Sequence, residues 1–81
     1  MALVTIYNET LDKFKKELEN VDGRIDEYSE YMKLHPERKG DIRTLIYARD
    51  NVYKMMLITC IRQLRREREL VFSIIEKERN R

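Results

Sequence analysis

The sequence has very little of several residue types on which small folds often depend. Its 81 residues include one Cys, one His, one Pro, two Gly and no Trp. A single Cys excludes a disulfide framework, and one Cys with one His excludes a His/Cys metal site built within one chain. The scarcity of Gly and Pro argues against a turn-rich β fold and favours long helices.

Long apolar runs and catalytic motifs are missing too. No run reaches the roughly 20 residues that a membrane-spanning helix needs, and residues 1–20 lack the basic start and apolar stretch of a secretory signal. There is no Gly-rich phosphate loop, nucleophile elbow or pair of inward carboxylates. We therefore expect a cytoplasmic protein that is not an enzyme and that uses no cofactor, metal, membrane or small-molecule substrate.

Charged residues make up 40% of the chain and hydrophobic residues 42%. The charged share lies far above the usual quarter, and a chain of this length cannot easily bury a two-layer core alone. We expect residues 1–81 to form a single helical domain that completes its core against a second copy or a partner subunit.

A heptad pattern predicts the first helix, at about residues 8–34. Its apolar residues alternate spacings of three and four: Val4, Tyr7, Leu11, Phe14, Leu18, Val21, Ile25, Tyr28 and Met32. Asn8 followed by Glu9 suits a helix start, although the pattern also allows a start as early as Val4, and residues 2–7 could instead form an extended arm. Gly23 lies on the outer face without a change of phase, so we expect a continuous helix rather than a turn.

Residues 35–40 predict the connection, because Pro36 disfavours helix at the residue before it and Gly40-Asp41 offers a new helix start. His35 is expected to be an exposed loop residue. From about residue 41 to residue 79 there is no Gly or Pro, enough for about 58 Å of helix. The predicted inner stripe of this second helix, interrupted by Arg49 and Glu67, consists of Ile42, Ile46, Tyr53, Leu57, Cys60, Leu64, Val71 and Ile75.

Folding the chain back at the connection brings the two stripes into one antiparallel register. Met32 then lies opposite Ile42, Val21 opposite Tyr53, and Cys60, as a buried thiol, opposite Phe14. The predicted fold is all-α, an antiparallel two-helix hairpin with a long second helix. Its predicted core comprises Leu11, Phe14, Leu18, Val21, Tyr28, Ile46, Tyr53, Leu57 and Leu64.

The second helix has more apolar surface than one neighbour can cover. Met55 and Ile58 point away from the predicted stripe, so we expect the middle of this helix to be covered by another chain. A two-fold homodimer forming a four-helix bundle is favoured, since most soluble oligomers are of that type; docking on a different protein would satisfy the same requirement. The predicted partner interface comprises Met55, Ile58, Arg62, Arg65, Arg66 and Phe72.

The arginines of this interface have two interpretations. Residues 1–34 hold five Lys/Arg and eight Asp/Glu, whereas residues 35–81 hold twelve and seven. The run could be an ordinary solvated face, or it could meet phosphates or an acidic partner. Interleaved acids and a net charge of only +2 make direct DNA contact the less favoured interpretation.

The segment from Ile61 to Ile74, preceded by Asp50-Asn51-Val52, resembles the long second helix in the helical domain of GINS subunits, which are replication factors that bridge the MCM helicase ring to other replisome parts. Small helical accessory subunits of archaeal replicative polymerases are similar. The resemblance covers about residues 8–75 and does not include the small β domain of the GINS family. It implies a helical scaffold with inter-subunit contacts at Arg62, Arg65, Arg66 and Arg68. The residue composition also leans towards a thermophile.

Three functions follow as hypotheses. The first is a non-catalytic helical scaffold subunit of a DNA-replication or other nucleic-acid-handling complex, in which contact with nucleic acid is indirect. The second is a homodimeric four-helix-bundle regulator, viral or host, that binds a protein target. The third is a direct DNA-binding protein, whose affinity should fall steeply with salt.

Overall fold

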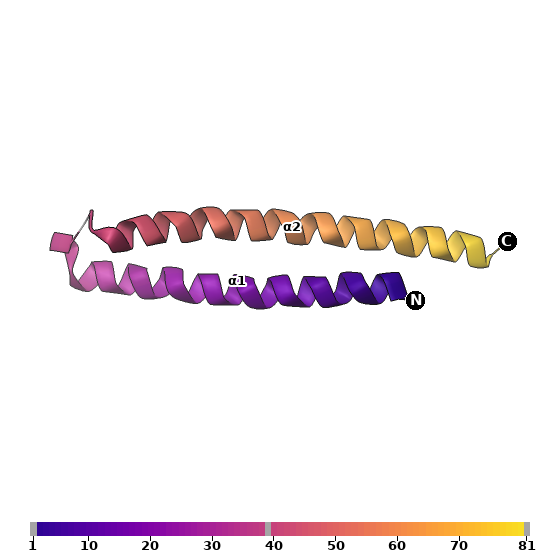
Figure 1. The fold of residues 1–81 in the computed structure, drawn as a ribbon, viewed down its shortest axis with the longest axis horizontal. Helices are drawn as coiled ribbons and strands as arrows, with labels where there is room; N and C mark the ends of the chain where they lie inside the picture. Colours follow the sequence, from indigo (N-terminus) through magenta and orange to yellow (C-terminus); the bar gives the residue numbers. More distant parts are fainter. Residues whose placement is uncertain (1, 39, 81) are drawn as a thin grey trace.

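The computed structural model describes residues 2–38 and 40–80, which form an antiparallel helical hairpin (Figure 1). Helix α1 spans Ala2–Leu34, a short 3₁₀ turn η1 spans Pro36–Arg38, and helix α2 spans Ile42–Arg79. The described part of the chain contains no strand, which confirms the predicted all-α hairpin. The two helices lie side by side in a rod of 67 × 15 × 15 Å, and the end of α2 extends past the start of α1 (Figure 1).

Helix α1 begins at Ala2, several residues before the predicted start. The alternative of an extended arm at residues 2–7 is wrong. Asn8 does not cap the helix; its side-chain oxygen accepts a hydrogen bond from Arg68 of α2 at 2.8 Å. Val4 and Tyr7 are half-buried, so contact with α2 stabilises the first turns and outweighs the local capping signal.

The helix passes through Gly23 without interruption, as predicted. Asp22 does not form a turn but makes an ion pair with Lys54 of α2 at 2.6 Å. Gly23 is exposed, and a Cβ atom added there would have no neighbour within 4 Å. Nothing in the fold therefore requires glycine at this position.

The connection leads into α2 through an ordinary N-cap. The only positive φ among the described residues belongs to Gly40, at 92°, a conformation that costs little for glycine alone. Asp41 then caps α2: its Oδ1 accepts from the backbone N–H of Arg43 at 2.8 Å. Thr44 Oγ1 accepts from the N–H of Gly40 at 3.1 Å and so ties the turn to the new helix.

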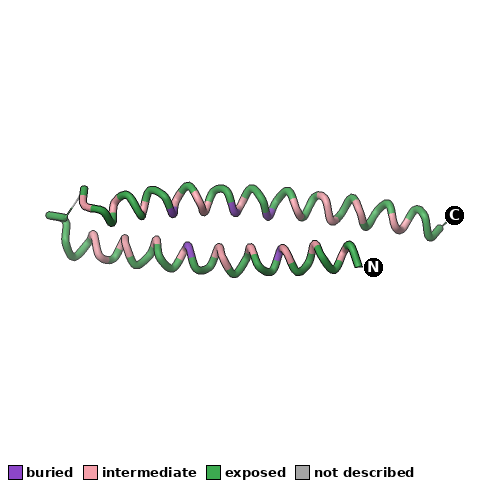
Figure 2. Tube along the Cα trace, in the orientation of Figure 1, coloured by how far each residue is buried: buried purple, intermediate pink, exposed green. Residues whose placement is uncertain are grey.

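The core is a thin line between the helices (Figure 2). Among the described residues, its buried apolar side chains are Leu11, Val21, Leu57 and Ile61. Of the other predicted core residues, Ile46 is exposed. The rest are half-buried, and they are Phe14, Leu18, Tyr28, Tyr53 and Leu64.

Contacts along the hairpin follow the predicted antiparallel register. Near the connection, the rings of Tyr28 and Tyr47 stack with centroids 4.5 Å apart. At the open end, the hydroxyl of Tyr7 donates to Glu67 Oε2 at 3.3 Å. The pairing therefore runs in one register from end to end.

The predicted inner stripe of α2 is partly wrong. Ile42 and Ile46 are 71% and 41% exposed, and Cys60, predicted to be a buried thiol, is also exposed. We call the stripe that does face α1 the inner seam. All its members are buried or half-buried, and they are Tyr47, Asp50, Lys54, Leu57, Ile61, Leu64, Arg68, Val71 and Ile75.

The inner seam, rather than the predicted stripe, faces α1 because specific contacts across the hairpin fix the rotation of α2 about its axis. Tyr47 stacks on Tyr28, and Asp50 pairs with Arg24 of α1. These contacts require α2 to turn Tyr47 and Asp50 towards α1, which carries Ile42 and Ile46 to the outside. The predicted stripe thus combines residues that lie on two different faces of α2.

We expect Gly23→Ala to stabilise the hairpin by about 0.5–1 kcal/mol, because alanine loses less backbone entropy in a helix and meets no neighbour here. Urea unfolding followed by circular dichroism measures the change. Gly40→Ala is the matched control: its positive φ predicts a loss of stability. A destabilised Gly23→Ala variant would contradict the continuous helix.

Candidate functional site

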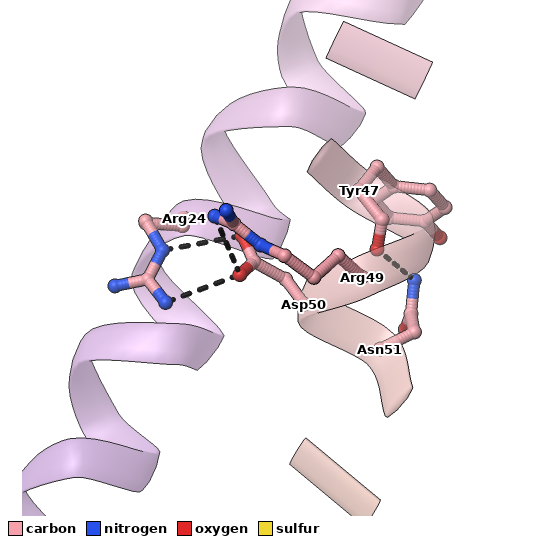
Figure 3. Close-up of polar contacts among 5 residues, drawn as sticks. All are labelled: Arg24, Tyr47, Arg49, Asp50 and Asn51. Carbon is pink, nitrogen blue, oxygen red and sulfur yellow. Dashed lines mark hydrogen bonds and ion pairs between the residues drawn. The ribbon is translucent and has the colours of Figure 1, made fainter. Parts of the chain in front are cut away.

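The main polar contact between the helices joins Arg24 of α1 to Asp50 of α2 (Figure 3). Arg24 Nε donates to Asp50 Oδ2 and Arg24 Nη2 to Oδ1, both at 3.1 Å. Arg49 Nη2 lies 3.6 Å from the same Oδ1. Asp50 is only 2% exposed, whereas the Arg24 side chain is 43% exposed. The carboxylate is thus buried, and solvent reaches the guanidinium groups that hold it.

These contacts set the charge state of Asp50. Hydrogen bonds from Arg24 lower the pKa of the carboxyl below its ordinary value of 3.8; burial opposes them, and the positive charges of Arg24 and Arg49 add to the lowering. Because the pKa is lower in the folded chain, the carboxylate contributes stability above its ordinary pKa. That contribution is lost as the pH falls through the lowered value.

The sequence prediction missed this pair. Arg24 lies on the edge of the predicted α1 stripe, and Asp50 belongs to the segment that resembles a known family but to neither predicted apolar stripe. A usable signal was present: Asp50 is spaced one heptad before Leu57, and the predicted register sets it opposite Arg24. A lone carboxylate on an apolar stripe, with a cation opposite, indicates a buried ion pair.

A shallow groove of about 340 Å³ lies next to this pair, between the helices. Aromatic and guanidinium groups line it, and the guanidinium carbon of Arg43 lies 3.9 Å from the ring centre of Tyr31. Its other lining residues include Arg24, Tyr28, Ile46 and Tyr47. The described residues contain no cluster of three or more His, Cys, Asp or Glu side chains able to hold a metal ion. The groove therefore offers apolar and aromatic contact with a basic rim.

A second, exposed heptad stripe runs along α2, and we call it the second seam. Spacings of four and three alternate along it without interruption. It consists of Ile42, Ile46, Arg49, Tyr53, Met56, Cys60, Gln63, Glu67, Leu70 and Ile74. Seven of the ten positions are hydrophobic.

Most apolar side chains of the second seam face solvent. The exposed fractions are 71% for Ile42, 59% for Met56, 62% for Leu70 and 53% for Ile74. Arg24, Arg49, Tyr53 and Met56 border a further open groove beside the seam. A helix apolar on two faces is buried on two faces in a stable assembly, and α1 covers only one of them.

The predicted partner interface lies mainly on the other side of α2. Met55 and Phe72 are 69% and 45% exposed, and Ile58 is half-buried. The arginines 62, 65 and 66 are exposed and make no hydrogen bond or ion pair with any other described residue. This side therefore combines a few apolar side chains with three unpaired cations.

The fourth arginine of the run behaves differently. Arg68 belongs to the inner seam and donates to Asn8 of α1. Its contact is within the hairpin, whereas the family resemblance implied a contact between subunits.

His35 lies in the connection and is exposed, as expected from the sequence. Its Nδ1 is 3.4 Å from Glu37 Oε1, and its ring packs against Tyr31 with centroids 4.7 Å apart. Among the helices that the structure describes, none has the length and apolar character to cross a lipid bilayer.

Comparison of the chain with protein-family models, with curated proteins and with solved structures gave no match. The resemblance to the GINS helical domain stays a prediction. A function for this chain is therefore inferred from the geometry of the hairpin.

We expect Arg24→Met to lower the melting temperature at neutral pH by roughly 4–8 °C, because it leaves the buried Asp50 carboxylate without its two best hydrogen bonds. The difference from the unaltered chain should shrink as the pH falls through the lowered pKa of Asp50, where the carboxyl becomes protonated in both proteins. Thermal unfolding at a series of pH values measures this.

Arg49→Met is the matched control, since Arg49 is 70% exposed and only 3.6 Å from the carboxylate. It should have a much smaller effect on melting. Equal effects of the two variants at every pH would contradict the assigned role of the Arg24 pair.

Proposed function

We propose that this chain is a non-catalytic helical interaction module, which binds another helix through the second seam of α2. The observation that carries the proposal is an uninterrupted heptad stripe left exposed by the hairpin. Ile42, Met56, Leu70 and Ile74 are each more than half exposed along it. A stripe with this spacing is suited to knobs-into-holes packing against one further helix.

Energetics support a partner of some kind. Among the residues that the structure describes, four apolar side chains are buried in the core of the hairpin, Leu11, Val21, Leu57 and Ile61, which is little for a domain of this size. Each large apolar side chain removed from water contributes roughly 1.5–3 kcal/mol, so covering the exposed apolar side chains of the second seam would add to the little that the hairpin buries completely.

The proposal has two versions, which differ in the assembly that the chain would join. A scaffold subunit of a DNA-replication or other nucleic-acid-handling complex is supported by the resemblance at residues 50–52 and 61–74. A homodimeric regulator with a protein target is supported by the second seam, which extends along most of α2 without interruption. Both versions use the same surface.

A second candidate function is contact with an acidic partner or nucleic acid. The observation that favours it is the group of exposed arginines at positions 62, 65 and 66, none of which is paired within the described chain. Arginine binds phosphates and carboxylates through two parallel hydrogen bonds. This surface lies mainly on the opposite side of α2 from the second seam, so the two functions can be tested separately.

Two adjacent methionines test the first proposal. A photocrosslinking amino acid placed at position 56, on the second seam, should join the chain to its protein partner in cells of its native host. The same group at position 55 should give little product, although Met55 is 69% exposed against 59% for Met56. Denaturing electrophoresis and mass spectrometry detect and identify the product.

Crosslinks from position 55 but not from position 56 would instead assign the interface to the predicted side of α2. Absence of crosslinks from both positions would contradict an interaction module of this kind.

Salt dependence tests the second candidate function. If the arginine surface binds DNA, the affinity for a duplex should fall steeply between low and moderate salt, and Arg65→Glu with Arg66→Glu should remove most of it. Fluorescence anisotropy with a labelled duplex measures both. A weak affinity that does not change with salt or with the two substitutions would exclude direct DNA binding.

A further inference from the structure

We infer that the partner of the second seam is a second copy of this chain, whose α2 packs antiparallel to the first about a two-fold axis near residue 58. This inference rests on the proposed function and specifies the partner. The evidence is the order of residues along the second seam, which is complementary to its own reverse.

The apolar ends of the seam match first. In an antiparallel pair centred near residue 58, Ile42 of one copy lies opposite Ile74 of the other, and Ile46 lies opposite Leu70. Near the axis, Met56 lies opposite Cys60. All ten positions of the seam then find a partner, and the contact extends for about 50 Å of helix.

The charged positions match in the same register. The seam contains one cation, Arg49, and one anion, Glu67, and these two residues lie opposite each other. The two-fold axis makes the pair occur twice. Of the remaining polar positions, Gln63 lies opposite Tyr53, whose hydroxyl gives the amide a hydrogen-bonding partner.

Other arrangements lose this match. A shift of one heptad places either Ile74 or Cys60 opposite Arg49 and leaves apolar positions at the ends of the seam uncovered. A parallel dimer places Arg49 against its own copy and does the same for Glu67, so like charges meet in both layers. Charge complementarity therefore selects the antiparallel register.

The hairpin leaves both Arg49 and Glu67 able to form an ion pair with a second copy. Arg49 is 70% exposed and reaches its own Asp50 only at 3.6 Å. Glu67 is half-buried and accepts hydrogen bonds from Tyr7 at 3.3 Å and from Gln63 at 3.1 Å. A carboxylate has about four acceptor positions, so Glu67 is held in place and can still accept a guanidinium from the second copy.

The angle between the seams suits a bundle. Each of the residues 49, 56, 63 and 70 directly precedes an inner-seam residue, so the two seams are about 100° apart around α2. Neighbours at nearly a right angle around one helix are the arrangement in a four-helix bundle. The two-fold axis then sets both α1 helices on the same side of the α2 pair.

The area that such a dimer needs is a small part of the surface of the chain. A stable interface removes roughly 800 Å² from each partner, which is about one eighth of the 6575 Å² surface of this chain. A seam of ten positions along most of α2 can supply this area.

The charge pair gives the first test. Arg49→Glu alone sets two acids against each other in both layers and should weaken the dimer by about tenfold or more; Glu67→Arg alone should do the same. The double variant, with the charges exchanged, should recover most of the affinity. Sedimentation velocity over a concentration series measures the dissociation constant. Arg65→Glu, an exposed charge change on the side of α2 away from the seam, is the matched control, and circular dichroism checks that each variant keeps its helices.

Crosslinking gives a second test that leaves the charges unaltered. In a Cys60→Ser background, chains carrying Ile46→Cys and chains carrying Leu70→Cys are mixed and treated with a short bismaleimide. The register predicts product between the two kinds of chain and none between two copies of Ile46→Cys, whose thiols would lie about 36 Å apart.

The outcomes separate the inference from the proposed function. Mixed crosslinks together with rescue by the double variant support the antiparallel register. Crosslinks between two Ile46→Cys chains, or no rescue in folded variants, would overturn it. A chain that stays monomeric at all concentrations would also overturn it, whereas the proposed function would then stand or fall on the photocrosslinks to another protein from position 56.

Discussion

The rest of the structure depends on the contact between the Arg24 guanidinium and the Asp50 carboxylate. Asp50 is almost fully buried, and two hydrogen bonds from Arg24 at 3.1 Å replace the water that it loses. Rotating α2 by one residue would remove Asp50 from the interface and bring Arg49 into it. The pair therefore decides which stripe of α2 lies against α1 and which stripe stays exposed.

The hairpin is thin, and its two helices differ in how polar their solvent-facing sides are. Its rod is 15 Å across in both short directions, so each helix has only one neighbour and most of its circumference meets solvent. Helix α1 tolerates this exposure because its outer positions are mainly charged and polar. Helix α2 differs, because Ile42, Met56 and Leu70 remain exposed on a stripe beside the one that α1 covers. Heptad spacing thus describes both the stripe of α2 that packs on α1 and the stripe that the hairpin leaves exposed.

Two chemically different surfaces result on α2. The second seam is apolar, with one cation and one anion at matching distances from its centre. The rest of the exposed surface of α2 carries unpaired arginines: Arg62 and Arg65 lie away from the second seam, on the side of Met55 and Phe72, and Arg66 lies at the edge of the seam. An assembly that joins through the apolar seam would leave the arginines free for an acidic partner, which is why the two surfaces are proposed as separate sites.

The sequence by itself determined that the chain is helical, that the helix is interrupted at residues 35–40, and that the two helices pair in one antiparallel register. These features follow from the heptad spacing of the apolar residues and from Pro36 and Gly40, which act locally or along a single helix. Only the tertiary structure decided that α1 begins at Ala2, that Cys60 is exposed and that Asp50 is buried. The physical reason is that α2 carries two heptad stripes one residue apart, and both satisfy the same periodicity. Choosing between them depends on contacts with another helix, such as Arg24 with Asp50 and Tyr28 with Tyr47, and a pattern along one helix does not contain that information.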